Sequence, residues 1–141
     1  MIALGQRYRN LLLLQLIYAG TGSLFNFISL VRIAIGDTPL TQTNPAIGIL
    51  VMACIAGAAS AGLFGFVKTF AVCNLMLIPP LLFGGIVPHV LASAHQIGST
   101  LLIPLVVAVG INIFGVVVMT LGLVSAMVAL LRNFLSRLQS L

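Results

Sequence analysis

Charged residues are scarce in this sequence of 141 residues: they make up 5% of it, against 61% hydrophobic residues. A soluble domain carries roughly 25% charged residues, because its surface faces water. This chain has too few polar residues to cover such a surface, so the sequence predicts an all-α integral membrane protein. No hydrophilic stretch is long enough to fold separately. We therefore expect a single polytopic membrane domain over residues 1–141.

Acidic residues are almost absent, since Asp37 is the only one and lies outside the apolar segments. Carriers that couple transport to protons or sodium ordinarily place a carboxylate inside a membrane span. The sequence therefore argues against that class of transporter. It also contains no HExxH motif and no plausible Ser-His-Asp set. We expect no enzymatic activity from this chain alone, although it is compatible with membership of an enzyme complex.

Cysteine and large aromatic residues are also few. Cys54 and Cys73 both lie in apolar segments and form no CxxC motif, which indicates packing residues rather than redox or metal chemistry. There is no tryptophan, and there are only two tyrosines. A free-standing bundle usually keeps a belt of Trp and Tyr at both membrane interfaces. The missing belt indicates that part of the perimeter contacts protein instead of lipid.

Four apolar segments are present, and about 20 apolar residues suffice to cross a membrane. We expect spans at residues 11–31, 46–64, 70–92 and 101–131, followed by an amphipathic interfacial tail at 132–141. The first apolar run continues to Val31, so it is too long for the hydrophobic region of a signal peptide. Asn44-Pro45 predicts the start of the second span. Lys68 separates the second and third spans into a tight hairpin, because a lysine at the membrane centre costs about 3 kcal/mol.

Basic residues lie singly at the ends of these segments, which is typical of lipid-headgroup anchors and not of a nucleic-acid surface. Five fall on one predicted side: Arg7, Arg9, Lys68, Arg132 and Arg137. The other side holds only Arg32, partly offset by Asp37. The candidate locations are the bacterial inner membrane and an organelle membrane. The positive-inside rule then predicts that both termini lie on the cytoplasmic side, or on the equivalent side of the organelle membrane.

Small and polar residues recur at helical spacing in three spans and predict helix-packing faces. They are Gln15, Gly22 and Asn26 in the first span, Ala53, Gly57, Ala61 and Gly65 in the second, and Asn112, Gly115 and Gly122 in the last. Asn26, Asn74 and Asn112 supply one asparagine to each of three spans. These amides either meet within the bundle or contact a neighbouring subunit. The small residues of the second span likewise pack either against another helix of this chain or against a different protein.

The third span is irregular, since it contains Pro79, Pro80 and Pro88. Each proline removes a backbone donor and clashes with the preceding turn, so we expect a kink or break at Pro79-Pro80. Broken membrane helices occur where protein or water satisfies the freed backbone groups, and transporters build binding sites from them. A kink that serves shape alone is the alternative.

His89 and His95 flank the connection to the last span and are the candidate cofactor-binding residues. Imidazole can ligate a haem or pigment metal. The alternative for both histidines is that they are ordinary polar residues of a loop near the membrane interface. No cofactor is clearly implied, although lipid, quinone or pigment would suit a membrane chain.

These features lead to three functional hypotheses. The leading one is a small non-catalytic accessory or scaffold subunit of a larger respiratory, photosynthetic or transport complex, which acts through helix packing. Its partners would be other membrane subunits, or copies of itself, together with lipid. The second is a small oligomeric channel or carrier, in which the broken third helix and Asn74 or Asn112 would line a polar path between subunits. The third is binding of quinone, pigment or haem through His89 or His95.

Overall fold

The computed structural model describes residues 5–95 and 102–139 and, within α4, leaves the side chains of Ser93 and His95 undescribed. The described residues form helices joined by short connections and contain no strand. The elements are α1 (Gln6–Ala34), α2 (Pro45–Leu63), α3 (Val67–Pro80), the π-helix η1 (Leu81–Ile86), α4 (Val87–His95) and α5 (Leu102–Leu138). The predicted all-helical fold is confirmed.

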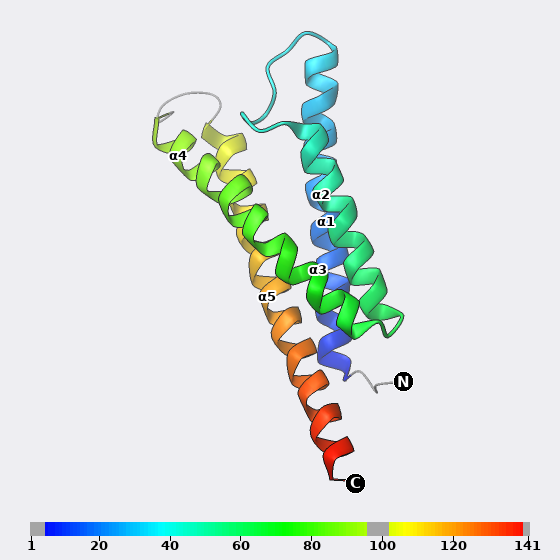
Figure 1. Cartoon of the computed structure of the whole chain (residues 1–141). Coiled ribbons are helices and arrows are strands. Elements are labelled where there is room, and N and C mark those ends of the chain that lie inside the picture. The colour runs from blue at the N-terminus through cyan, green and yellow to red at the C-terminus, as the bar shows by residue number, and fades with distance from the viewer. Residues whose placement is uncertain (1–4, 96–101, 140–141) are drawn as a thin grey trace.

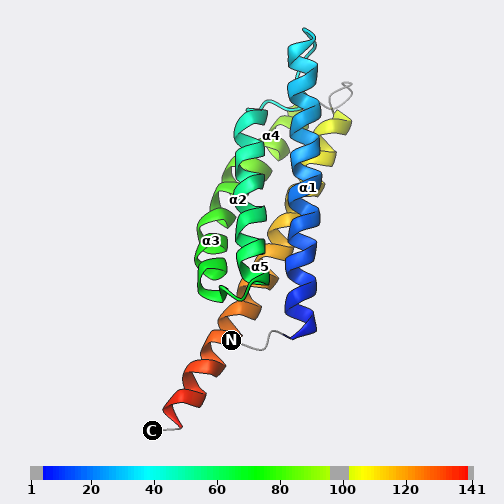
Figure 2. The same ribbon diagram turned by 90° about the vertical axis from the view of Figure 1, so that its right-hand side faces the viewer.

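Four helical spans are long and apolar enough to cross a membrane. They are Gln6–Ala34, Pro45–Leu63, Val67–Ala92 and Leu102–Leu138. The third span joins α3, η1 and most of α4 into one continuous helical unit. The C-terminal end of α5 continues beyond the other helices (Figures 1 and 2). The start of α1, the α2–α3 turn and the end of α5 lie at one end of the bundle, which we call the termini end. The α1–α2 loop lies at the other end, the loop end.

The kink predicted in the third span is confirmed. Pro79 and Pro80 are the last residues of α3, and the π-helical turn of η1 follows them directly. Proline has no N–H to donate and crowds the preceding turn, and a wider π turn accommodates that defect without ending the helix. Pro88 is the second residue of α4. The span is therefore kinked but continuous.

Local signals explain both ends of α2. Asn44 caps its start, because the Asn44 side chain accepts a hydrogen bond from the Ala46 N–H at 2.9 Å. The helix ends at Leu63, and Gly65 follows in the turn with a φ of 88°. The prediction that Gly65 extends the helical stripe of small residues is therefore wrong. A left-handed φ suits glycine, and here it reverses the chain into α3.

The α1–α2 loop is tied back to α1. Arg32 and Asp37 form an ion pair at 2.8 Å. The Ser29 hydroxyl, which is buried, accepts a hydrogen bond from the Leu40 N–H at 3.0 Å. These contacts hold the loop over one end of the bundle.

The core consists of two clusters stacked along the bundle. The cluster towards the termini end contains Tyr8, Leu12, Val67, Phe70, Ala71 and Ala126. The next contains Tyr18, Ala19, Met52, Ile55, Leu81 and Met119. In this part of the bundle α1 packs on α2 and α5, and α3 packs on α2 and α5.

The helices separate towards the loop end. Within the described residues the backbone of α4 runs close only to η1 and α5, whereas the backbone of α2 runs close only to α1 and α3. Figure 1 shows α4 and the start of α5 leaning away from α1 and α2. The bundle is therefore packed at the termini end and divided into two groups of helices at the loop end.

Candidate binding pocket

A cavity of about 370 Å³ lies where the two groups of helices separate. Every part of the bundle contributes to its lining, including Asn26 of α1, Thr41 of the loop, Gly48 of α2, Gly85 of η1, His89 of α4 and Asn112 of α5. Pockets that bind small molecules typically measure about 300–1,000 Å³ and are apolar with a few convergent polar groups. This cavity has that character.

No charged side chain lines the cavity within the described part of the chain. Its walls are mainly apolar side chains and glycines, among them Phe25, Ile47, Val51 and Met52. An ion buried in such surroundings without a partner would carry a large desolvation cost. The cavity therefore suits an uncharged molecule.

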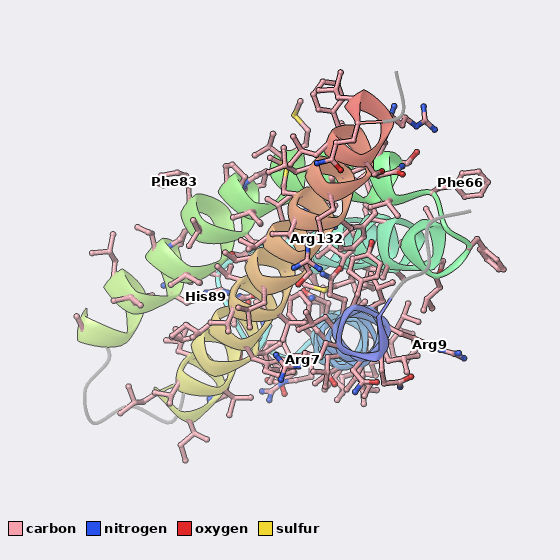
Figure 3. All side chains as sticks on the ribbon, turned by 90° about the horizontal axis from the view of Figure 1, so that it is seen from below. Arg7, Arg9, Phe66, Phe83, His89 and Arg132 are labelled. Atoms are coloured by element: carbon pink, nitrogen blue, oxygen red, sulfur yellow. The ribbon has the colours of Figure 1, made fainter. Side chains whose placement is uncertain are left out.

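His89 faces the cavity from α4. It is 5% exposed, and it follows Leu81 and Gly85 at four-residue spacing, so the three residues share the inner face of the third span. Figure 3 shows the His89 side chain between α4 and α5. Its imidazole makes no hydrogen bond within the described residues. A buried polar group without a protein partner is available to a ligand or water.

Asn112 presents a donor to the same cavity. Its Oδ1 accepts a hydrogen bond from the Tyr18 hydroxyl at 3.2 Å, and this buried contact orients the amide. The Nδ2 atom lies beside Gly85, where an added Cβ would be 3.1 Å away. Because the oxygen is occupied, the amide NH₂ is the part of Asn112 that remains to donate to a bound molecule.

Asn26 presents a hydrogen-bond acceptor to the cavity. Its Nδ2 donates to the Gly22 carbonyl at 2.8 Å, so Oδ1 is left as an acceptor. The Asn26 amide packs directly against Gly48, where a Cβ would overlap it. Thr41 is buried at the loop side, and its hydroxyl is 3.0 Å from that of Thr43. The cavity thus offers both donors and acceptors.

The predicted packing residues of the first and last spans lie inside the bundle. Gln15, Gly22, Asn112, Gly115 and Gly122 are buried, and Asn26 is partly buried. Two of the glycines allow close approach of α1 to α5. A Cβ on Gly115 would overlap the Tyr18 ring, and a Cβ on Gly122 would lie 2.7 Å from Gln15 Nε2.

The predicted packing residues of the second span do not lie inside the bundle. Ala53 and Gly57 are exposed and Ala61 is partly buried, while the inward face of α2 is formed by Met52 and Ile55. A Cβ on Gly57 would meet nothing within 4 Å. This small-residue face, Ala53-Gly57-Ala61, therefore points away from its own bundle.

The three asparagines make separate hydrogen bonds. Asn74 is fully buried and its Nδ2 donates to the Phe70 carbonyl at 2.9 Å, whereas its Oδ1 has no hydrogen-bond partner. Asn26 bonds within α1, and Asn112 bonds to Tyr18. They are spread along the bundle and do not form one hydrogen-bonded set.

Of the two predicted cofactor residues, only His89 can be placed at the cavity, since the side chain of His95 lies outside the described part of the structure. No group of three or more His, Cys, Asp or Glu side chains that could hold a metal ion occurs among the described residues. Sequence reasoning missed Tyr18, Thr41, Gly48 and Gly85 as neighbours of the site. The glycine pair at 84–85 and the polar loop were visible signals, but neither locates a cavity.

In comparisons with known proteins, no protein-family model, curated protein or solved structure matches the chain.

Proposed function

We propose that this protein is an intramembrane binding protein for a small uncharged molecule that carries a hydrogen-bonding group such as a carbonyl. The observation that carries the proposal is a buried imidazole, His89, which faces an apolar cavity without a protein partner among the described residues, while the NH₂ of Asn112 lines the same cavity. A ligand carbonyl could accept a hydrogen bond from either group. A quinone head group has that chemistry.

The packed half of the bundle supports binding over conduction through one chain. Leu12, Phe70 and Met119 are fully buried beyond the cavity, towards the termini end. Asn112 lines the cavity, whereas Asn74 is buried in the core, so these two candidate path residues do not share one continuous opening within the chain. Within one chain, a pocket that ends at the packed termini end is therefore a better match than a channel.

The first prediction concerns the two polar groups. His89→Leu and Asn112→Leu are each expected to weaken binding of a short-chain alkyl benzoquinone by about 2- to 10-fold, the equivalent of one hydrogen bond of about 0.5–1.5 kcal/mol. The measurement is equilibrium binding of the labelled quinone to the purified protein in mild detergent.

One variant serves as the control. Asn133→Leu makes the same change on α5 outside the cavity. It should bind the quinone like the wild type. A wild-type protein without saturable binding, or equal affinity in all three variants, would refute the proposed function.

A second candidate function is an accessory subunit of a larger membrane complex. The outward position of the small-residue face of α2, Ala53-Gly57-Ala61, favours it, because small residues let another helix approach closely in lipid. In this proposal the termini end, which carries Arg7, Arg9 and Lys68, faces the cytoplasm or its equivalent.

The second prediction tests this face. Gly57→Leu should leave the free energy of unfolding of the isolated chain within about 1 kcal/mol of wild type, because the added side chain meets open space. It should nevertheless abolish co-purification of any stoichiometric membrane partner in native mass analysis. Partner recovery equal to that of wild type would exclude this face as the contact.

A further inference from the structure

We infer that the ligand enters the cavity sideways from the bilayer, between α2 and η1, and that it is therefore a lipid-soluble molecule with an apolar chain. This inference rests on the proposed binding function and names its ligand class. The opening is defined by Ile47 and Gly48 on α2 and by Gly84 and Gly85 on η1, all four of which line the cavity.

The backbones on the two sides of this opening lie apart. Within the described residues the backbone of α2 runs close to α1 and α3, whereas that of η1 runs close to α3, α4 and α5. Leu81 of η1 joins Met52 and Ile55 of α2 in the core cluster, so side-chain packing closes the gap below the opening. Ile47 is 60% exposed and Gly84 is also exposed, so both rims reach the surface of the bundle. The cavity thus reaches the outside through the flank of the bundle.

The surface around the opening is apolar. Leu50 is 64% exposed beside one rim, and Phe83 is 71% exposed beside the other. Figure 3 shows Phe83 pointing away from the bundle. Both residues belong to helices long and apolar enough to span the membrane. Such a surface faces hydrocarbon, so the opening leads into lipid.

The α1–α2 loop covers part of the cavity at the loop end. Thr41 is 6% exposed and its hydroxyl contacts that of Thr43, and the Leu40 N–H is held by the Ser29 hydroxyl. With a helical rise of about 1.5 Å per residue, the opening lies within the first two turns of α2. A polar head group would therefore sit near the membrane interface, with its chain leading out between α2 and η1.

Gly84 allows a direct test of this route. A Cβ at Gly84 would meet nothing within 4 Å, so Gly84→Phe places a ring at the rim without displacing packed atoms. In vesicles, the association rate of the short-chain alkyl benzoquinone should fall at least tenfold in Gly84→Phe. Gly20→Phe, which changes an exposed glycine of α1 outside the cavity, should associate at the wild-type rate. Gly84→Ala, which leaves the opening clear, should do so too.

A second measurement follows the chain itself. A benzoquinone with a photoreactive diazirine at the end of its alkyl chain should label residues 47–51 and 81–87. Labelling confined to residues 37–43, or a wild-type association rate in Gly84→Phe, would overturn the lateral route.

The two failures are distinguishable. If His89→Leu weakens binding but Gly84→Phe has no effect on the rate, the lateral route is wrong and the binding function stands. If the quinone does not bind saturably to wild type, or if His89→Leu and Asn112→Leu bind it as wild type does, the binding function itself is wrong.

Discussion

Gly115→Leu is expected to lower the free energy of unfolding by about 3 kcal/mol, the upper part of the range for overpacked cores. The Tyr18 ring occupies the space that any Cβ at this position would need, so α1 and α5 would have to separate. Separation would also break the hydrogen bond from the Tyr18 hydroxyl to Asn112. The measurement is reversible unfolding in mixed detergent micelles, followed by circular dichroism.

Gly110 provides the matched control on the same helix. It is exposed, and a Cβ there would meet nothing within 4 Å. Gly110→Leu should be neutral or slightly stabilising, since glycine inside a helix costs about 0.5–1 kcal/mol relative to alanine. Equal effects at the two glycines would mean that the close contact between α1 and α5 does not support the bundle.

Ala108→Phe is expected to reduce binding of the alkyl benzoquinone at least 100-fold. Ala108 is 3% exposed and lines the cavity, so a phenyl ring there would occupy space that the ligand needs. The effect should exceed that of His89→Leu, because the ring excludes the whole molecule rather than removing one hydrogen bond of about 0.5–1.5 kcal/mol. The measurement is the same equilibrium binding assay.

The folded state should tolerate this change. The cavity of about 370 Å³ has room for the ring, so Ala108→Phe should unfold close to the wild-type midpoint. Val106→Phe, at a position of α5 that is 57% exposed and outside the cavity, is the control and should bind normally. Normal binding by Ala108→Phe would show that the quinone binds somewhere else.

Much of the fold was predictable because its causes are local in sequence. Apolar length sets the spans, Asn44-Pro45 starts α2, and Pro79-Pro80 produces the kink at which η1 begins. The exception at Gly65 has a local cause as well, since a glycine can extend a helical pattern or end it with a positive φ.

The site was less predictable, because a cavity depends on how helices diverge. His89 was visible as a candidate, and Asn112 as one of several packing residues. Their convergence requires the bend at η1 and the separation of α4 from α2, which periodicity does not encode. The direction of the Ala53-Gly57-Ala61 face was likewise undecided, since small residues at four-residue spacing fit an internal and an external contact equally well.

The most direct test of the binding function is mass analysis of the small molecules that remain with the protein after gentle purification, with wild type and Ala108→Phe processed in parallel. We expect the wild type to carry a near-stoichiometric uncharged molecule with a carbonyl or similar acceptor and an apolar chain, and Ala108→Phe to lack it. If both proteins release the same bulk membrane lipids and nothing else, the cavity is not a binding site and the proposed binding function is wrong.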